Sequence, residues 1–150
     1  MSYSKVAVID IGSNTSKLLI AEKSASGQII PSFENTIPCR ISKGISTRKQ
    51  FSLSAEIISK IIDVISNFLK IIQEQDVNRI VVVGTEALRK ASNTPSLADM
   101  IYQKFGFELK VLSGMQEAET IALGICSDSN LKHVSHFQAF DLGGGSLEVF

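Results

Sequence analysis

The sequence predicts an α/β domain with a mixed five-stranded sheet flanked by helices, and three observations support this. Near the start, residues 6–9 (Val-Ala-Val-Ile) are typical of a strand buried on both faces. Apolar residues then recur at the helical period over residues 57–72. From residue 79 onward, strand-like and helix-like segments alternate, as they do where crossover helices connect parallel strands.

The expected elements follow one another in a simple order. An antiparallel meander of three strands comes first: one ends at Asp10, the next runs on to Ser24, and the third covers residues 29–36. Ser54 then caps a long helix that covers the sheet, and this helix shows no evident chemistry. The later elements are a strand at 79–84, a helix from about 96 to 105, a strand at 107–112, a helix from about 115 to 124 and a strand at 138–142.

Composition narrows the class of protein. The 150 residues are 44 % apolar and 20 % charged, which indicates one globular domain with a sizeable core. The formal net charge is zero and no basic stripe stands out, so we expect no nucleic-acid partner. Cys39 and Cys126 show no metal-type spacing, and no segment reads as a signal peptide or a membrane span. We therefore expect a cytoplasmic protein without a membrane partner.

The last expected strand stops after four residues, at Phe150. A strand cut there leaves an unpaired edge, which is a liability. We therefore expect residues 1–150 to be one domain of a longer protein, or a truncated product.

Two stretches of the chain, residues 10–16 and 141–147, share one pattern. Each has an apolar strand that ends in aspartate, followed by a turn of glycine and small polar residues, so that Asp10 aligns with Asp141. One such loop alone would suit an ordinary hairpin, but the repetition favours a device in which backbone amides surround an anion. The predicted phosphate-binding residues are Gly12, Ser13, Asn14 and Thr15 in the first turn, and Gly143, Gly144, Gly145 and Ser146 in the second.

The two aspartates suggest a metal ion. If the turns face one another across a single cleft, Asp10 and Asp141 flank the phosphates, which their carboxylates repel unless a cation lies between. Mg²⁺ prefers oxygen ligands and is usually held by one or two carboxylates together with substrate phosphate. The sequence therefore predicts Mg²⁺ as the cofactor.

Three charged positions could complete such a site. Arg89 follows Thr85 by four residues, at a strand-to-helix junction, and can offer a planar fork to phosphate; the alternative is a surface salt bridge. Glu117 lies in the first turn of the helix expected at about 115–124. It is either a general base or a charge that suits the helix dipole. Arg40 begins the basic segment 40–50, which either contacts a polyanion or is a solvated loop.

Two common nucleotide-binding motifs do not occur. The chain has no GxxxxGK(S/T), which disfavours a P-loop nucleotide hydrolase. It has no GxGxxG opening a helix, which disfavours a dinucleotide-binding fold.

Four blocks of sequence resemble one known family. They are residues 8–14 (VIDIGSN), 85–93 (TEALRKASN), 112–118 (LSGMQEA) and 141–146 (DLGGGS). Together they resemble the N-terminal domain of the exopolyphosphatase and guanosine pentaphosphate phosphohydrolase family. That family belongs to the actin, sugar-kinase and heat-shock-chaperone ATPase superfamily. The resemblance implies a ribonuclease H-like (actin-like ATPase) domain, and a second such domain that this chain lacks.

The resemblance also implies an activity and roles for residues. It implies Mg²⁺-dependent hydrolysis of terminal phosphates from polyphosphate or from guanosine penta- or tetraphosphate, in a complete protein that is a candidate homodimer. Glu117 would be the catalytic base, Asp141 and Glu148 would be metal or water ligands, and Arg89 and Arg40 would bind phosphate. The chain departs from the family at Gln116, Glu119 and residues 41–42, which puts the choice of substrate in question.

Two other functions fit the same residues. One is a kinase or ATPase of the same superfamily, which transfers phosphate to an acceptor other than water. The other is a non-catalytic module that binds phosphorylated nucleotides. Glu117 beside a water-accessible cleft favours hydrolysis over transfer to an acceptor, whereas the missing second domain gives weight to the binding module.

Overall fold

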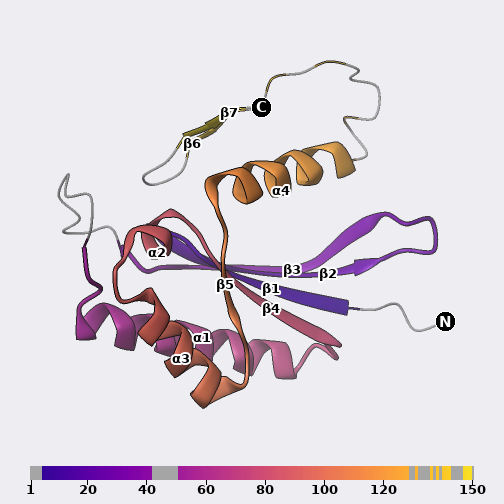
Figure 1. The fold of residues 1–150 in the computed structure, drawn as a ribbon. Helices are drawn as coiled ribbons and strands as arrows, with labels where there is room; N and C mark the ends of the chain where they lie inside the picture. Colours follow the sequence, from indigo (N-terminus) through magenta and orange to yellow (C-terminus); the bar gives the residue numbers. More distant parts are fainter. Residues whose placement is uncertain are drawn as a thin grey trace.

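A computed structural model describes residues 5–41, 51–128, 131, 136, 138, 140–142 and 147–149. The strands are β1 (Lys5–Ile11), β2 (Thr15–Lys23), β3 (Ile29–Pro38), β4 (Arg79–Gly84), β5 (Leu109–Val111), β6 (Phe140–Leu142) and β7 (Leu147–Val149). The helices are α1 (Ala55–Gln73), α2 (Glu86–Lys90), α3 (Thr94–Phe105) and α4 (Gly114–Ser127). Figure 1 shows their arrangement.

The first five strands form one mixed sheet in the order β3-β2-β1-β4-β5. β1 pairs antiparallel with β2 and parallel with β4, while β2–β3 is antiparallel and β4–β5 is parallel. The predicted five-stranded sheet, with its meander followed by parallel strands, is therefore confirmed. β6 and β7 form a separate antiparallel pair.

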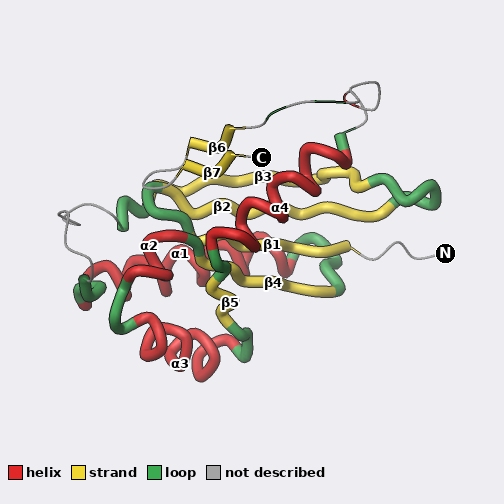
Figure 2. The backbone as a smooth tube through the Cα atoms, turned by 45° about the horizontal axis from the view of Figure 1, so that its top comes forward, coloured by secondary structure: helices red, strands yellow, loops and turns green. Residues whose placement is uncertain are grey.

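Helices cover the two faces of the sheet unequally. α1 and α3 lie against one face, and α4 crosses the other, with the β6–β7 hairpin beside it (Figures 1 and 2). Ala7, Ile9 and Ile11 of β1 are at most 1 % exposed, whereas Val6 and Val8, at the alternating positions, are only half-buried. The prediction that this strand is buried on both faces is thus wrong for one face, because α4 covers that face only in part.

The long helix α1 supplies much of the core. Its cap is the predicted one, since the Ser54 Oγ accepts a hydrogen bond from the Ile57 N–H at 3.2 Å. Five residues at the helical period are buried: Ile61, Val64, Ile65, Phe68 and Ile72. This stripe packs in one cluster with the buried residues of β1, β2 and β4.

Several element boundaries differ from expectation. α3 begins at Thr94 instead of near Ser96, because Pro95 fits the first helical turn, where its missing N–H costs nothing. β5 covers only Leu109–Val111 of the strand expected at 107–112, whereas β3 and α4 extend further than expected, to Pro38 and Ser127. In the described ranges, no helix combines the length and the apolar character needed to cross a membrane.

Candidate functional site

The carboxyl ends of three parallel strands meet at one edge of the sheet. Ile11 at the end of β1 is in register with Gly84 of β4, and Gly84 with Val111 of β5. The segments that follow the strands are tied together as well: the Thr85 N–H donates to the Ile11 carbonyl at 3.4 Å, and the Leu112 N–H donates to the Gly84 carbonyl at 2.9 Å. In open α/β sheets this edge is where ligands bind.

The turn between β1 and β2 is tight and depends on its glycine. The Gly12 N–H donates to the Thr15 carbonyl at 3.1 Å. A Cβ at position 12 would lie 2.9 Å from that same carbonyl oxygen, so a larger residue would force the turn to open. Ser13 is buried and Asn14 is exposed. The predicted first phosphate loop is thus a compact turn at the ligand-binding edge.

Arg40 lies beside this turn. The Asn14 carbonyl accepts two hydrogen bonds from the end of β3, one from the Cys39 N–H at 2.9 Å and one from the Arg40 N–H at 2.8 Å. The Ser16 hydroxyl and the Cys39 thiol are buried and 3.0 Å apart. These contacts fix Arg40 next to the predicted phosphate loop, although 26 positions separate it from Asn14 in the sequence (40 − 14 = 26).

Arg89 and Glu117 form an ion pair at the same edge. The Arg89 Nη1 donates to the Glu117 Oε2 at 3.0 Å and to the Leu112 carbonyl at 2.6 Å. The two side chains are 27 % and 14 % exposed, so the pair is partly buried. Arg89 thus forms a salt bridge, which was the alternative to phosphate binding in the sequence analysis. Its partner, however, is the predicted catalytic base.

The first turn of α4 holds Glu117 in place. The Ser113 Oγ accepts from the Gln116 N–H at 3.2 Å, while the Gln116 Oε1 accepts from the Ser113 N–H at 2.9 Å. This reciprocal pair is a capping box. Gln116, which departs from the family pattern, therefore has a structural role immediately before Glu117.

The predicted metal ligands lie in different hairpins and face residues of different charge. The Asp10 Oδ1 is buried at the end of β1, and the strand register places Asp10 opposite Lys17. The register of the second hairpin places Asp141 opposite Glu148. Among the described side chains, no group of three or more His, Cys, Asp or Glu residues is placed to hold a metal ion.

Part of the predicted site lies outside the described residues. This part comprises the second turn, residues 143–146, the side chains of Asp141 and Glu148, and the basic segment 42–50. That the two turns face one another therefore stays a prediction, as does the metal site.

One contact in the second sequence block was not expected. The Asn93 Nδ2 donates to the Leu53 carbonyl at 2.9 Å, and the Leu53 N–H donates to the Asn93 Oδ1 at 2.8 Å. This two-bond clamp holds the chain before α1 against the start of α3. No local pattern signals it, because the partners are 40 residues apart.

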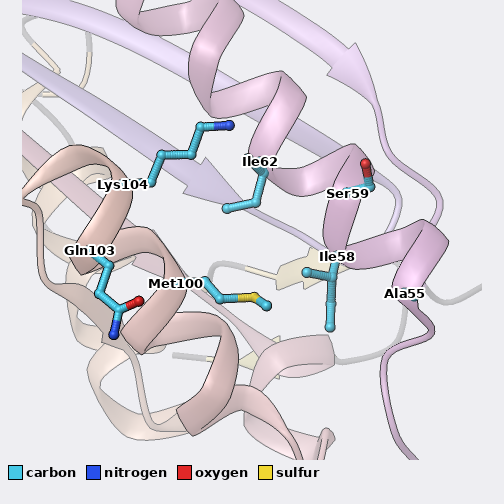
Figure 3. Close-up of a pocket in the computed structure, with 7 residues that line it drawn as sticks. All are labelled: Ala55, Ile58, Ser59, Ile62, Met100, Gln103 and Lys104. Atoms are coloured by element: carbon cyan, nitrogen blue, oxygen red, sulfur yellow. The ribbon is translucent and has the colours of Figure 1, made fainter.

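An apolar pocket of about 500 Å³ between α1 and α3 is a poor candidate for the same ligand. Ile58, Ile62 and Met100 line it, with Lys104 at its side (Figure 3). The described residues that line it include none of the predicted phosphate-binding residues. The strand edge, with its amides and charged side chains, suits an anion far better.

The fold and this edge define an actin-like ATPase-type α/β domain with a candidate anion site at the carboxyl ends of its parallel strands. The chain belongs to the Ppx/GppA phosphatase family, whose sequence pattern matches residues 19–150. The resemblance found in the four sequence blocks is thereby confirmed.

Two named relatives and a solved structure point to the same family. The chain is 26 % identical over 145 residues to exopolyphosphatase 1 of Mycobacterium tuberculosis, covering 97 % of this chain and 41 % of that protein. It is 32 % identical over 149 residues to a guanosine-5'-triphosphate,3'-diphosphate pyrophosphatase of Pseudoalteromonas translucida, covering 95 % of this chain and 28 % of that one. The crystal structure of the Aquifex aeolicus Ppx/GppA family member superposes with a TM-score of 0.83 at 28 % identity, over 99 % of this chain and 47 % of that one. This chain therefore spans less than half the length of these relatives.

Proposed function

We propose that the protein hydrolyses the terminal phosphoanhydride bond of inorganic polyphosphate or of guanosine penta- or tetraphosphate. The observation that carries the proposal is the Arg89–Glu117 pair, 3.0 Å apart at the ligand-binding edge of the sheet. It unites the predicted base and the predicted phosphate ligand. The names of the relatives, an exopolyphosphatase and a guanosine-5'-triphosphate,3'-diphosphate pyrophosphatase, support this class of reaction.

In this proposal, Glu117 activates water. Arg89 engages the Oε2 of its carboxylate, and we assign Oε1 to the attacking water. The carboxylate orients the water and takes its proton as the water attacks phosphorus. Because the acceptor is water, the products are a free phosphate and a shortened anion, rather than a phosphorylated second substrate.

Backbone amides and arginines bind the substrate in the same scheme. The amides of residues 12–15 and 143–146 surround the phosphates, and glycine lets the backbone approach closely. Arg89 can shift one of its guanidinium donors from the Leu112 carbonyl to a phosphate oxygen, since a guanidinium carries several donors. Arg40 would bind the substrate beside the first turn.

The acidic residues fit Mg²⁺. Asp10, Asp141 and Glu148 offer carboxylate oxygens, the donors that this ion prefers. Two acidic positions face each other in the β6–β7 register, an arrangement that is unfavourable unless a cation is shared. When bound, Mg²⁺ would offset the negative charge that develops during phosphoryl transfer.

We further propose that the complete protein works in the cytoplasm and that it forms a homodimer. The relatives are more than twice as long as this chain, since it covers 41 % and 28 % of the two named above. In this proposal, a second domain forms the opposite wall of the cleft. Size-exclusion chromatography with light scattering on the complete protein tests the dimer.

A substrate panel tests the proposed reaction. Phosphate release by the complete protein is measured with polyphosphate, guanosine pentaphosphate and ATP, each with Mg²⁺ and with a chelator. Glu117→Gln should lower turnover by about 10²- to 10⁴-fold while substrate binding persists. Glu119→Gln is the matched control, because Glu119 is an exposed carboxylate two residues along α4. Equal turnover in both variants would remove Glu117 from the mechanism, and phosphate transfer from ATP to an acceptor would indicate a kinase.

A further inference from the structure

A second hollow lies beside the candidate site, between the end of β3 and the start of α1. Its volume is about 370 Å³, and its lining residues are Cys39, Arg40, Ser54, Glu56, Ile57 and Lys60. The two cations, Arg40 and Lys60, reach it from segments that are not adjacent in the chain. We call this hollow the Arg40–Lys60 pocket.

Two residues of the pocket lining are hydrogen-bonded to the turn of residues 12–15. The Asn14 carbonyl in that turn accepts the N–H groups of Cys39 and Arg40, at 2.9 and 2.8 Å, and both of these residues line the pocket. The amino end of α1 lies at the same end of the sheet as the carboxyl end of β1 (Figures 1 and 2). Arg40 therefore lies beside the turn and also lines the pocket, and Lys60 lines the same pocket from α1.

The charges of the pocket suit an anion. Both cations are exposed, and no ion pair joins Arg40 or Lys60 to another residue in the described ranges. Glu56 supplies one negative charge, so the described residues of the lining carry two cations and one carboxylate. A phosphate group can therefore gain charge-assisted hydrogen bonds there without displacing an existing partner of either cation.

We propose that the Arg40–Lys60 pocket binds a second anionic group of the substrate, downstream of the phosphate that is cleaved. The inference deepens the proposed function and rests on it. It assigns the protein to substrates that carry a further phosphate group beyond the one at the turn. It also gives a role to Lys60, which lies on a helix whose sequence pattern indicated only core and solvent faces.

Two ligands share this chemistry, a linear polyphosphate chain and the second pyrophosphate group of a guanosine pentaphosphate. Both present a phosphate group at a distance from the first. The test therefore uses tripolyphosphate, long-chain polyphosphate and guanosine pentaphosphate as separate probes. The long probe that loses most affinity when Lys60 is removed is the one that occupies the pocket.

Lys60→Ala in the complete protein is the central variant, and Lys70→Ala is its matched control. Lys70 is also exposed and lies in the last turn of α1, at the end away from the pocket. Lys60→Ala should raise the KM for the long probe, long-chain polyphosphate or guanosine pentaphosphate, by about fivefold, which is the scale of an exposed ion pair. The kcat and the KM for tripolyphosphate should stay unchanged. Lys70→Ala should change none of these values.

Glu56→Gln should act in the opposite direction. Removing the one carboxylate of the pocket should lower the KM for the long probe by about twofold. A general disturbance of α1 would raise the KM in both variants. A rise with Lys60→Ala and a fall with Glu56→Gln would therefore exclude it. An equal effect of Lys60→Ala on short and long probes, or an effect no larger than that of Lys70→Ala, would overturn the proposal.

Failure of the proposed reaction can be recognised separately. If the wild-type protein hydrolyses none of the probes, calorimetric binding of long-chain polyphosphate still compares Lys60→Ala with Lys70→Ala. Weaker binding by Lys60→Ala alone supports the pocket without the reaction. Equal binding by both variants contradicts the pocket.

Discussion

The hairpins β1–β2 and β6–β7 share a sequence pattern but differ in their place in the fold. β1 and β2 lie inside the five-stranded sheet, and each pairs with a neighbour on both sides. Among the described strands, β6 and β7 pair only with each other, and they lie beside α4. A two-stranded hairpin is only marginally stable on its own, so the second hairpin depends on what packs against it or binds to it.

Their charges differ as well. The register places Asp10 opposite Lys17 in the first hairpin, and opposite charges across strands are stabilising. In the second hairpin it places Asp141 opposite Glu148, where like charges are destabilising. The register thus favours the first hairpin electrostatically and disfavours the second, and a cation that would offset this repulsion belongs to the proposed metal site.

Helix α4 connects the second hairpin to the main sheet. It contacts β7, and through Glu117 it is bonded to Arg89 at the end of the main sheet. A change at one hairpin can thus be compared with the matching change at the other.

Amide hydrogen exchange should separate the hairpins most strongly. The amides of β1 should exchange about a thousandfold more slowly than those of β6 and β7, because central strands open only with the whole domain. Adding Mg²⁺ with a phosphate-containing ligand should slow exchange in β6–β7 more than in β1–β2. Equal protection of the two hairpins would show that they do not differ in stability.

The Asp141→Asn and Asp10→Asn variants should need different Mg²⁺ concentrations for half-maximal activity. Loss of a group in the second shell of a metal site commonly weakens metal affinity by about 10- to 100-fold, and loss of a ligand should cost at least as much. We expect Asp141→Asn to raise the Mg²⁺ concentration for half-maximal activity by about 100-fold, and Asp10→Asn by about 10-fold. The reverse order would contradict the interpretation of the two registers.

Gly12→Ala should destabilise the first hairpin by about 1–3 kcal/mol, because a methyl group in a tight contact forces backbone shifts. The added Cβ would lie 2.9 Å from the Thr15 carbonyl oxygen. Gly124→Ala is the control: its Cβ has no neighbour within 4 Å, and alanine in a helix interior should stabilise by about 0.5–1 kcal/mol. Thermal unfolding measures both, and a neutral Gly12→Ala would show that the turn tolerates a side chain.

Ser113→Ala should have the smallest effect. It removes half of the capping box at the start of α4 and should cost about 1 kcal/mol. The control is Ser127→Ala, whose hydroxyl donates to the Gly124 carbonyl at the other end of α4 and should change stability by only a few tenths of a kcal/mol. Chemical denaturation compares the two, and equal losses would argue against a special role for the cap.

Sequence patterns predicted the sheet because its strands and helices depend on local periodicity. The apolar run of residues 6–9 indicates a buried strand, and the helical period of α1 indicates which face of that helix is buried. The unequal covering of the two faces was not predictable. It depends on where α4 lies, and that is decided by packing between distant segments.

The candidate site was predictable in its residue types but not in its contacts. Arg89 and Glu117 each carried a local signal, a strand-to-helix junction and a helix start. Their mutual contact joins residues 28 positions apart, and the third partner is a backbone carbonyl that no side-chain pattern reveals. Lys60 gave no signal at all, because its exposed position on α1 is that of any solvated lysine.

The central claim is that a phosphate chain lies between the turns of residues 12–15 and 143–146, with Glu117 beside its terminal phosphate. The most direct test is a crystal structure of the complete Glu117→Gln protein with Mg²⁺ and tripolyphosphate. We predict the terminal phosphate within hydrogen-bonding distance of the amides of residues 12–15 and of residues 143–146, with Arg89 in contact. An anion bound away from either turn, or two turns on opposite sides of the domain, would contradict the claim.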